Sequence, residues 1–264
     1  GLFTINADGD QVFFSKGNLQ YDGTNWKFAD NQYDYIETAT GYPMDHFTWG
    51  NINSLTYDGQ AYVEGTDNLS VNGSTDWGSN AISNGGNTAN SGWFTLSSAE
   101  WAYLFNTRTN ASSLYGHGKV GEVNGMIILP DSWLLPSGLS FTAGNSDWTN
   151  SYTTEQWSQM EAAGAVFLPA AGFRSGTSVY NVGSDGYYRS STAYGTDGAY
   201  IMYFESGDVN PANDNGRNGG FSVRLVRPVR PVNNAPALGD PYYSDGTWGN
   251  NTHASGATVI GVVA

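Results

Sequence analysis

Two stretches of this 264-residue sequence begin like helices, and turn-forming residues divide the rest into short apolar runs. In "TLSSAEWAYLFNTR", Ser97 and Glu100 have the spacing of a capping box, and in "TTEQWSQMEAAG" Thr153 and Gln156 repeat it. Gly164 then follows, where a left-handed residue usually ends a helix. We therefore expect two helices. Their buried faces should carry Trp101, Leu104, Phe105, Trp157 and Met160.

The remaining apolar runs predict short strands, at 11–21, 25–36, 126–130, 165–173, 199–204 and 220–227. Because strands and helices do not alternate regularly, the pattern predicts an α+β fold with long Gly/Asn-rich loops. Trp77 and Trp93 should hold the loops between residues 50 and 93. The Pro-rich stretch "RPVRPVNNAP" indicates a boundary. We expect one domain over 1–230, followed at 231–264 by a linker and a C-terminal extension or the start of a second module.

The charge balance limits the possible partners. Ten basic against 24 acidic residues give a net charge of −14, which disfavours nucleic acid and anionic membranes. Cysteine is absent, which excludes disulfides and thiol chemistry. No apolar run reaches the length of a transmembrane helix, so we expect no membrane insertion within this chain.

The sequence lacks a recognisable catalytic motif. His46, His117 and His253 lie near no convincing nucleophile, no G-x-S-x-G elbow occurs, and no paired-histidine spacing suggests zinc. Two acidic side chains could still meet in the fold as in a glycosidase, but nothing singles out a pair. We therefore expect a protein that is not an enzyme, with a glycosidase-like activity as a remote alternative.

Two segments resemble parts of calcium sites. "NADGDQ" starts like an EF-hand loop, but Gly9 is out of place and no Glu follows at the twelfth position. "NPANDN", from Asn210, resembles the sugar-binding loop of calcium-dependent lectins, but the partner Trp-Asn-Asp strand is missing. We expect neither a metal nor another cofactor.

The most unusual segment is rich in tyrosine. From Gly172 to Ser222, 28 of 51 residues are Gly, Ser, Asn or Tyr. This is the composition of a paratope, in which Tyr supplies amphipathic contact area and the small residues supply adaptable hydrogen bonds. Filling of turns in a Gly-rich fold would give a similar composition. In "AYIMYF" a buried Met202 and Phe204 would place Ile201 and Tyr203 on the outside. We favour an exposed binding surface.

The order of these motifs resembles a known family. "NLQY", "WKFADNQYDYI", "GWFTLSSAEWAYLFNTR", "VNGMIILPDSW", "GAVFLPAAGFRSGTSVYNVGSDGYYRSST" and "GGFSVRLVR" are similar, from about residue 10 to 230, to Bacteroidales surface proteins. Those proteins contain a C-type-lectin-like domain of the formylglycine-generating-enzyme, or Fibrobacter major paralogous, type. The resemblance implies a C-type-lectin-like fold. The enzymes of that superfamily use cysteines, so it does not imply their activity here.

Several members of this family are variable target proteins of diversity-generating retroelements, which rewrite adenines in a C-terminal segment. The resemblance places the variable segment at about 172–224. Each candidate position holds Asn or a residue that an AAY codon reaches by changes at its adenines. These positions are Ser175, Tyr180, Asp185, Tyr187, Tyr194, Gly195, Asp197, Gly198, Ile201, Tyr203, Asp208, Asp214, Gly216 and Asn218.

Arg189 stands where such sequences usually have Trp, which either removes a structural aromatic or supplies a cationic contact at the centre of the site. Of the candidates, we favour Arg189 for a strong ligand contact. Its replacement by Ala should then leave the fold intact and weaken binding. The expected partner is an unknown protein or glycan on another cell or surface, bound by a protein at the cell surface, outside the cell or on a phage particle. The alternatives are a surface protein with one fixed glycan ligand, and a structural or phage-tail scaffold.

Overall fold

The computed structural model describes residues 1–51, 62–229, 241–243 and 258–262. The chain divides into two compact units, Gly1–Arg227 and Pro228–Ala264. In the second unit, β16 (Pro241–Tyr243) pairs antiparallel with β17 (Val259–Val262). The rest of the predicted linker and extension lies outside the described residues. The first unit is a sheet-rich α+β structure with two helices and many short, mostly antiparallel strands.

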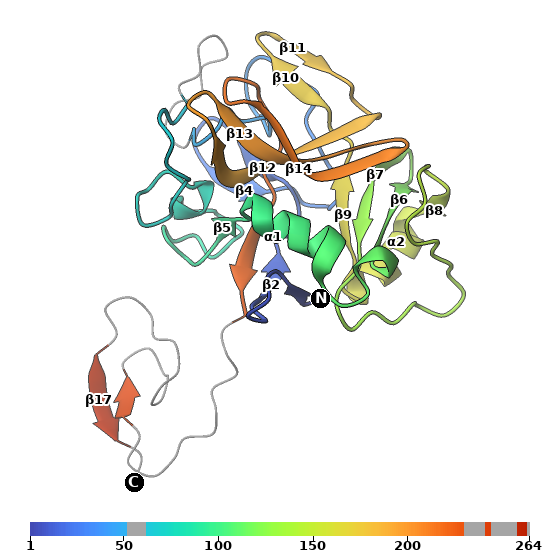
Figure 1. Ribbon diagram of the computed structural model, residues 1–264, viewed down its shortest axis with the longest axis horizontal. Helices are drawn as coiled ribbons and strands as arrows, with labels where there is room; N and C mark the ends of the chain where they lie inside the picture. Colours follow the sequence, from blue (N-terminus) through green and yellow to red (C-terminus); the bar gives the residue numbers. More distant parts are fainter. Residues whose placement is uncertain (52–61, 230–240, 244–257, 263–264) are drawn as a thin grey trace. The chain divides into compact units, whose positions relative to one another are not determined.

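One four-stranded sheet joins the beginning and the end of the first unit. Its order is β1 (Phe3–Thr4), β2 (Gln11–Phe14), β15 (Leu225–Pro228) and β5 (Phe94–Thr95). Segments more than 200 residues apart in the sequence thus lie side by side (Figure 1). This pairing brings the first and last strands of the unit together. The chain leaves this sheet after β5 and returns to it at β15.

A second four-stranded sheet has the order β8 (Asn150–Tyr152), β6 (Tyr115–Val120), β7 (Val123–Ile128) and β9 (Val166–Pro169). β6 and β8 run parallel, whereas β7 pairs antiparallel with both β6 and β9. β7 and β9 are buried almost throughout, as expected for short continuous apolar runs. The strands predicted at 126–130 and 165–173 are these two.

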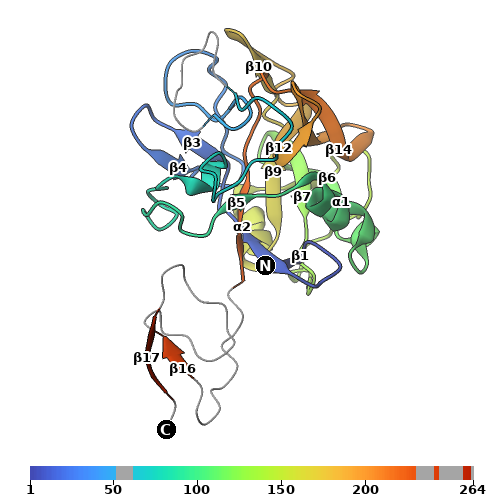
Figure 2. The ribbon, with the colours of Figure 1, turned by 60° about the vertical axis from the view of Figure 1, so that its left-hand side comes forward.

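The tyrosine-rich segment forms a three-stranded antiparallel sheet of β12 (Asp185–Tyr194), β13 (Gly198–Glu205) and β14 (Asp208–Gly216). A short hairpin of β10 (Phe173–Ser175) and β11 (Ser178–Tyr180) precedes it. Another pair, made of β3 and β4, completes the strands of this unit (Figure 2). Its bounds are Leu19–Tyr21 and Trp26–Phe28.

Both predicted helices are present with their capping boxes. α1 (Ser98–Ala102) has Ser97 as N-cap and continues as a π-helical turn over Tyr103–Thr107. α2 (Thr154–Ala162) has Thr153 as N-cap, and Gly164, with φ of +100°, follows it. Short 3-10 turns cover Trp77–Ser79 and Ala111–Ser113. The side chains predicted on the inner helix faces are all buried.

Three apolar clusters form the core of the first unit. The first lies between α1, the β12–β14 sheet and the sheet of β1, β2, β15 and β5, and it includes Trp101, Met202 and Phe204. The second gathers the rings of the long loops, with Trp77 fully buried. The third lies under α2 around Trp157. The underside of the β12–β14 sheet is therefore fixed by core packing.

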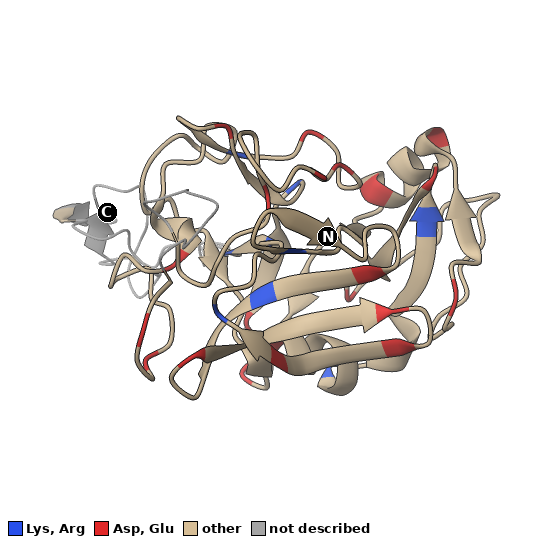
Figure 3. Ribbon diagram, turned by 90° about the horizontal axis from the view of Figure 1, so that it is seen from above, with Lys and Arg blue, Asp and Glu red and all other residues tan. Residues whose placement is uncertain are grey.

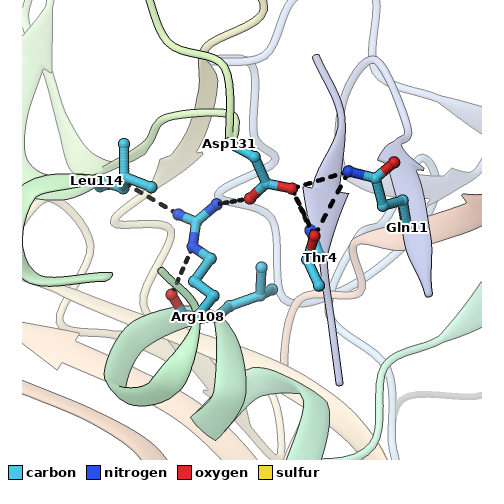
Figure 4. Close-up of polar contacts among 6 residues, drawn as sticks. Thr4, Gln11, Arg108, Leu114 and Asp131 are labelled. Atoms are coloured by element: carbon cyan, nitrogen blue, oxygen red, sulfur yellow. Dashed lines mark hydrogen bonds and ion pairs between the residues drawn. The ribbon is translucent and has the colours of Figure 1, made fainter. Parts of the chain in front are cut away.

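An ion pair connects the residue that follows the π-helical turn, Arg108, with strands β1 and β2 through Asp131. Arg108 pairs with Asp131 at 3.1 Å and also donates to the carbonyl oxygen of Leu114 at 3.3 Å (Figure 4). The second carboxylate oxygen of Asp131 accepts from the backbone N–H and the hydroxyl of Thr4, and from the amide of Gln11 (Figure 4). Burial lowers the pKa of Arg108, although the charge of Asp131 opposes this effect. This network stabilises the β1–β2 hairpin.

Candidate ligand-binding surface

The fifteen predicted site residues differ in exposure. Eight are exposed: Ser175, Tyr180, Tyr194, Gly195, Asp197, Asp208, Asp214 and Asn218. Two are half-buried: Tyr203 and Gly216. Five are buried: Asp185, Tyr187, Arg189, Gly198 and Ile201. The structure therefore presents only part of the predicted set to a ligand.

The exposed positions also lie at both ends of the β12–β14 sheet. Tyr194 pairs with Gly198 at one end, whereas Glu205 pairs with Asp185 and Asp208 at the other. Seven residues of β13 separate these ends, which is roughly 24 Å at the rise of an antiparallel strand. Asp208 and the tip around Tyr194 therefore cannot contact the same small ligand.

The prediction that Arg189 makes an exposed ligand contact is wrong. Its side chain is fully buried, and its guanidinium donates to the carbonyl oxygens of Phe47, Arg217 and Gly219. Its Cζ lies 4.2 Å from the centroid of the Phe221 ring. Burial, together with the charges of two neighbouring arginines, lowers the pKa of Arg189. Arg189 therefore stabilises the loop carbonyls and the ring beneath them.

Ile201 is also buried, contrary to the expectation from strand alternation. It packs with Tyr187 and Phe221 on the face of β13 opposite to Met202. A segment around Phe221 and the β10–β11 hairpin cover this second face, so both faces of the strand are occupied. Tyr203, next along this face, is half-buried, and burial, followed by the charge of Asp185, raises its pKa.

An aromatic cluster forms the cover of that face. The ring of Phe173 stacks on Tyr180 with centroids 5.5 Å apart and contacts Tyr187 edge-on at 5.1 Å. Tyr187 in turn contacts Tyr203 at 5.0 Å. Tyr180 is 49 % exposed, so the cluster runs from the interior to an accessible ring. Stacked rings of this kind supply large contact area with fixed geometry.

Asp185 and Tyr187 are held by a local hydrogen-bond network. One carboxylate oxygen of Asp185 accepts from the Asn181 side chain at 2.7 Å and from the Tyr187 hydroxyl at 2.9 Å. Burial raises the pKa of Tyr187 to about 12, so the phenol keeps its proton at neutral pH. The buried side chains of Asp185 and Tyr187 therefore satisfy each other's hydrogen bonds and orient the β10–β12 region.

The three predicted glycines differ in the space around them. A Cβ on Gly195 would meet nothing within 4 Å, although its φ is +62°. On Gly216 it would meet only the movable Asn218 side chain, at 2.7 Å. On Gly198 it would lie 2.8 Å from the carbonyl oxygen of Tyr194. Gly195 and Gly216 therefore have room for a side chain, although the positive φ of Gly195 strains most residue types. Gly198 cannot take a side chain without a shift of the backbone.

The accessible residues at the end of the β12–β13 hairpin form what we call the hairpin-tip patch: Tyr194, Asp197, Tyr200 and Asp214. The rings of Tyr194 and Tyr200 meet edge-on with centroids 5.2 Å apart, and Tyr194 is 48 % exposed. Tyr200 lies directly opposite Asp214 in the ladder, so their side chains share a face. Asp197 lies in the turn between the two strands. The patch thus combines two rings with two carboxylates.

Buried Arg217 fixes the backbone under this patch. Its guanidinium donates to the carbonyl oxygens of Gly198 at 2.8 Å, Val63 at 2.7 Å and Gly195 at 2.9 Å. Its Cζ lies 4.2 Å from the centroid of a Trp49 ring. The contact with Val63 also ties the 62–69 loop to the hairpin. Arg217 was not among the sequence-predicted residues, and it is central to this surface.

Five of the six arginines that the structure describes are buried: Arg108, Arg174, Arg189, Arg217 and Arg224. Arg189 and Arg217 bind backbone oxygens and aromatic faces rather than carboxylates. The only sequence signal was their setting, because each lies among Gly, Ser or aromatic residues without an adjacent acid. Arginine suits this role since its planar fork satisfies several acceptors at once.

Both described histidines are buried. The two ring nitrogens of His117 lie 2.7 Å from the Asn145 carbonyl oxygen and 2.8 Å from that of Glu205. His46 is buried next to Asp45, and burial, followed by the charge of Arg174, lowers its pKa to about 4. Burial raises the pKa of Asp45 to about 8. These two adjacent groups are both neutral at pH 7. His253 lies outside the described residues.

The described part of the chain contains no recognisable cluster of metal ligands. No three His, Asp or Glu side chains in it are arranged to hold a metal ion. The segment "NPANDN" lies in β14 rather than in a loop, which removes the resemblance to a lectin calcium loop. A cleft of about 250 Å³ lined by Phe13, Lys16 and Glu161 contains none of the predicted site residues.

A family model described as "Domain of unknown function (DUF8237)" matches residues 146–226, which cover β8, α2 and the whole tyrosine-rich sheet. Neither the curated proteins nor the solved structures contain a match to this chain. No helix in the described ranges is long and apolar enough to cross a membrane.

Proposed function

We propose that this chain is a non-enzymatic ligand-binding protein of the cell surface or of a phage particle, with a recognition surface in residues 172–224. We further propose that the fold is of the C-type-lectin-like type and that a retroelement diversifies this surface. The two helices, the short antiparallel strands and the long loops support the fold proposal. The motif resemblance set out above supports the proposal of diversification.

The observation that carries the proposal is how the hairpin-tip patch is held. Arg217 fixes its backbone through the carbonyl oxygens of Gly195 and Gly198. Every residue type has a carbonyl oxygen, so the hairpin keeps its anchor when its exposed side chains change. Tyr194 and Asp197 are exposed. A rigid backbone with exchangeable exposed side chains is what a diversified binding surface requires.

The codons for residues 172–224 in many isolates of the source population test this proposal. We expect substitutions at adenine-derived codons of exposed positions such as Tyr180, Tyr194 and Asp197. Arg189, Ile201 and Gly198 should stay constant because their side chains or backbones are enclosed. An unvarying segment would contradict diversification, and variation spread equally over buried and exposed codons would contradict the surface assignment.

A fixed-ligand glycan-binding protein is the second candidate. The exposed Tyr180 ring, stacked on Phe173, favours it because a sugar ring can stack on such a platform. An unvarying codon record, combined with glycan-array binding that Tyr180→Ala abolishes, would support this second candidate against the first.

A further inference from the structure

The hairpin-tip patch has two exposed carboxylates, those of Asp197 and Asp214. Burial lowers the pKa of Arg217 beneath the patch, and the negative charge of Asp197 opposes this effect, so Asp197 lies near one buried cation. By contrast, the buried carboxylate of Asp185 binds Asn181 and Tyr187. The carboxylates of Asp197 and Asp214 are therefore accessible at the surface, and Asp214 shares a face with Tyr200.

The cations of this region lie inside the protein. Residues 172–224 contain four arginines, and all four are buried: Arg174, Arg189, Arg217 and Arg224. The same segment has four exposed acidic residues: Asp197, Glu205, Asp208 and Asp214. Figure 3 shows acidic residues along loops and at strand ends. The accessible charge of the tyrosine-rich segment is thus entirely negative.

The neighbouring loop supplies no cation either. The Asn68 side chain accepts from the Ala193 N–H, and the Leu69 N–H donates to Ser191, so the 62–69 loop lies along β12. That loop belongs to a stretch, residues 28–107, without any Lys or Arg, while Glu64 and Asp67 in it are exposed. Among the described residues, buried Arg217 is therefore the cation that faces the patch, and no exposed cation complements it.

We propose that the hairpin-tip patch binds an arginine or lysine side chain presented by a basic protein surface. This inference rests on the proposed ligand-binding function and names its partner class. A cation over an exposed tyrosine ring contributes roughly 0.5–1 kcal/mol, and a carboxylate beside the ring adds a charge-assisted hydrogen bond. The net charge of −14 also attracts a basic partner from a distance.

A polyanionic partner does not fit this surface. Phosphate, sulfate or sialic acid groups would meet Asp197 and Asp214 without a described cation to receive them. A neutral glycan could stack on Tyr194, but it would leave the charge of both carboxylates unused. Charge complementarity therefore favours a basic protein over a glycan at this patch.

Binding of a short synthetic peptide, acetyl-GRGRGRG-amide, to the 15N-labelled full chain tests the inference. We expect shifts of the amide signals of residues 193–200 and 213–217, and similar shifts with the lysine version. The double variant Asp197→Asn/Asp214→Asn should bind the arginine peptide with an affinity about five- to tenfold lower. The control double variant Asp8→Asn/Asp10→Asn changes the net charge equally on a remote turn, and its affinity should stay within about twofold of that of the unchanged protein.

Three results would overturn the inference: equal losses in the two double variants, binding of the matching glutamate peptide, or no shift at the patch. If a neutral trisaccharide such as chitotriose shifts the amide signals of the patch and the arginine peptide does not, the ligand of the patch is a glycan rather than a basic protein. The codon survey is independent of these titrations. A diversified segment with no peptide binding would therefore remove the basic partner and leave the proposed function standing.

Discussion

The guanidinium of Arg189 lies over the ring of Phe221, with its Cζ 4.2 Å from the ring centroid. Phe221 lies in the segment that covers the outer face of β13, and Arg189 lies in β12, so the contact joins the sheet to its cover. The same guanidinium donates to the carbonyl oxygens of Arg217 and Gly219. One side chain thus fixes two loops and one aromatic ring.

Replacement of this side chain should destabilise the fold. Arg189→Met keeps much of the volume but leaves the carbonyl oxygen of Gly219 without a donor and that of Arg217 with only the Trp49 N–H. A buried acceptor without a donor costs about 1–3 kcal/mol, so we expect a loss of about 2–3 kcal/mol in the free energy of unfolding, measured by urea denaturation. Arg227→Met, at a half-buried position, is the matched control and should cost less than about 1 kcal/mol. An unchanged urea midpoint for Arg189→Met would contradict the structural role.

The role of Arg217 should appear as local opening. Arg217→Lys keeps the charge but cannot reach the carbonyls of Gly195, Gly198 and Val63 together, because lysine lacks the planar fork. Hydrogen exchange should accelerate at least tenfold at the amides of Leu69 and Ala193, which join the 62–69 loop to β12. The α2 amides should change less. Uniform acceleration over the whole unit would instead indicate a global loss of stability.

The buried Asp45 should make stability depend on pH. Its folded pKa of about 8 exceeds the value of about 3.9 in an unfolded chain, so its contribution to stability is lost as the pH rises through that window. The pKa of His46 is lowered to about 4 from about 6.5, so its term grows with pH between those values. Between about pH 4 and 6.5 the contributions of Asp45 and His46 to stability change in opposite directions. Above about pH 6.5 the loss of the Asp45 contribution dominates.

We therefore expect the free energy of unfolding to fall by roughly 1–2 kcal/mol between pH 6.5 and 8, because the slope is at most about 1.4 kcal/mol per pH unit and lessens near the folded pKa of Asp45. Asp45→Asn should remove this fall, since the amide oxygen can still accept from the Ile36 N–H as Asp45 does at 3.0 Å. Urea denaturation of both proteins at the two pH values measures the difference. Parallel curves for the two proteins would show that Asp45 does not titrate in this range.

Two glycines of the hairpin should respond differently to asparagine. Gly195→Asn should cost less than about 1 kcal/mol, because its side chain has free space and asparagine tolerates a positive φ. Gly198→Asn should cost about 1–3 kcal/mol, since its Cβ would press on the Tyr194 carbonyl oxygen. Thermal denaturation of the two variants decides this point. Equal melting temperatures would mean that the tip backbone adjusts freely.

Local features of the fold could be predicted from the sequence. The capping boxes at Ser97 and Thr153 are confirmed because both partners of each lie three residues apart on the same chain segment. The stop at Gly164 is confirmed for the same reason, since it depends on one residue's φ. Signals that are complete within one turn of helix do not need the tertiary structure.

The errors at the candidate site have a different origin. Alternation in β13 assigned Ile201 to the outside because it assumes one solvated face, whereas Phe221 covers that face from 20 residues away. Burial of Arg189 depends on carbonyl oxygens as distant as that of Phe47, 142 residues earlier. Backbone acceptors have no sequence signature, so no pattern could show that these arginines point inward.

Arg217 anchors the β12–β13 hairpin through backbone atoms, whereas the side chains of the hairpin tip are the groups exposed to a ligand. Its acceptors are carbonyl oxygens of Gly195 and Gly198, which a mutation at Tyr194 or Asp197 leaves in place. A synthetic library at Tyr194, Gly195, Asp197 and Asp214 should therefore yield members that share one backbone and differ in the chemistry of one surface. Selection from such a library would report on side-chain complementarity alone.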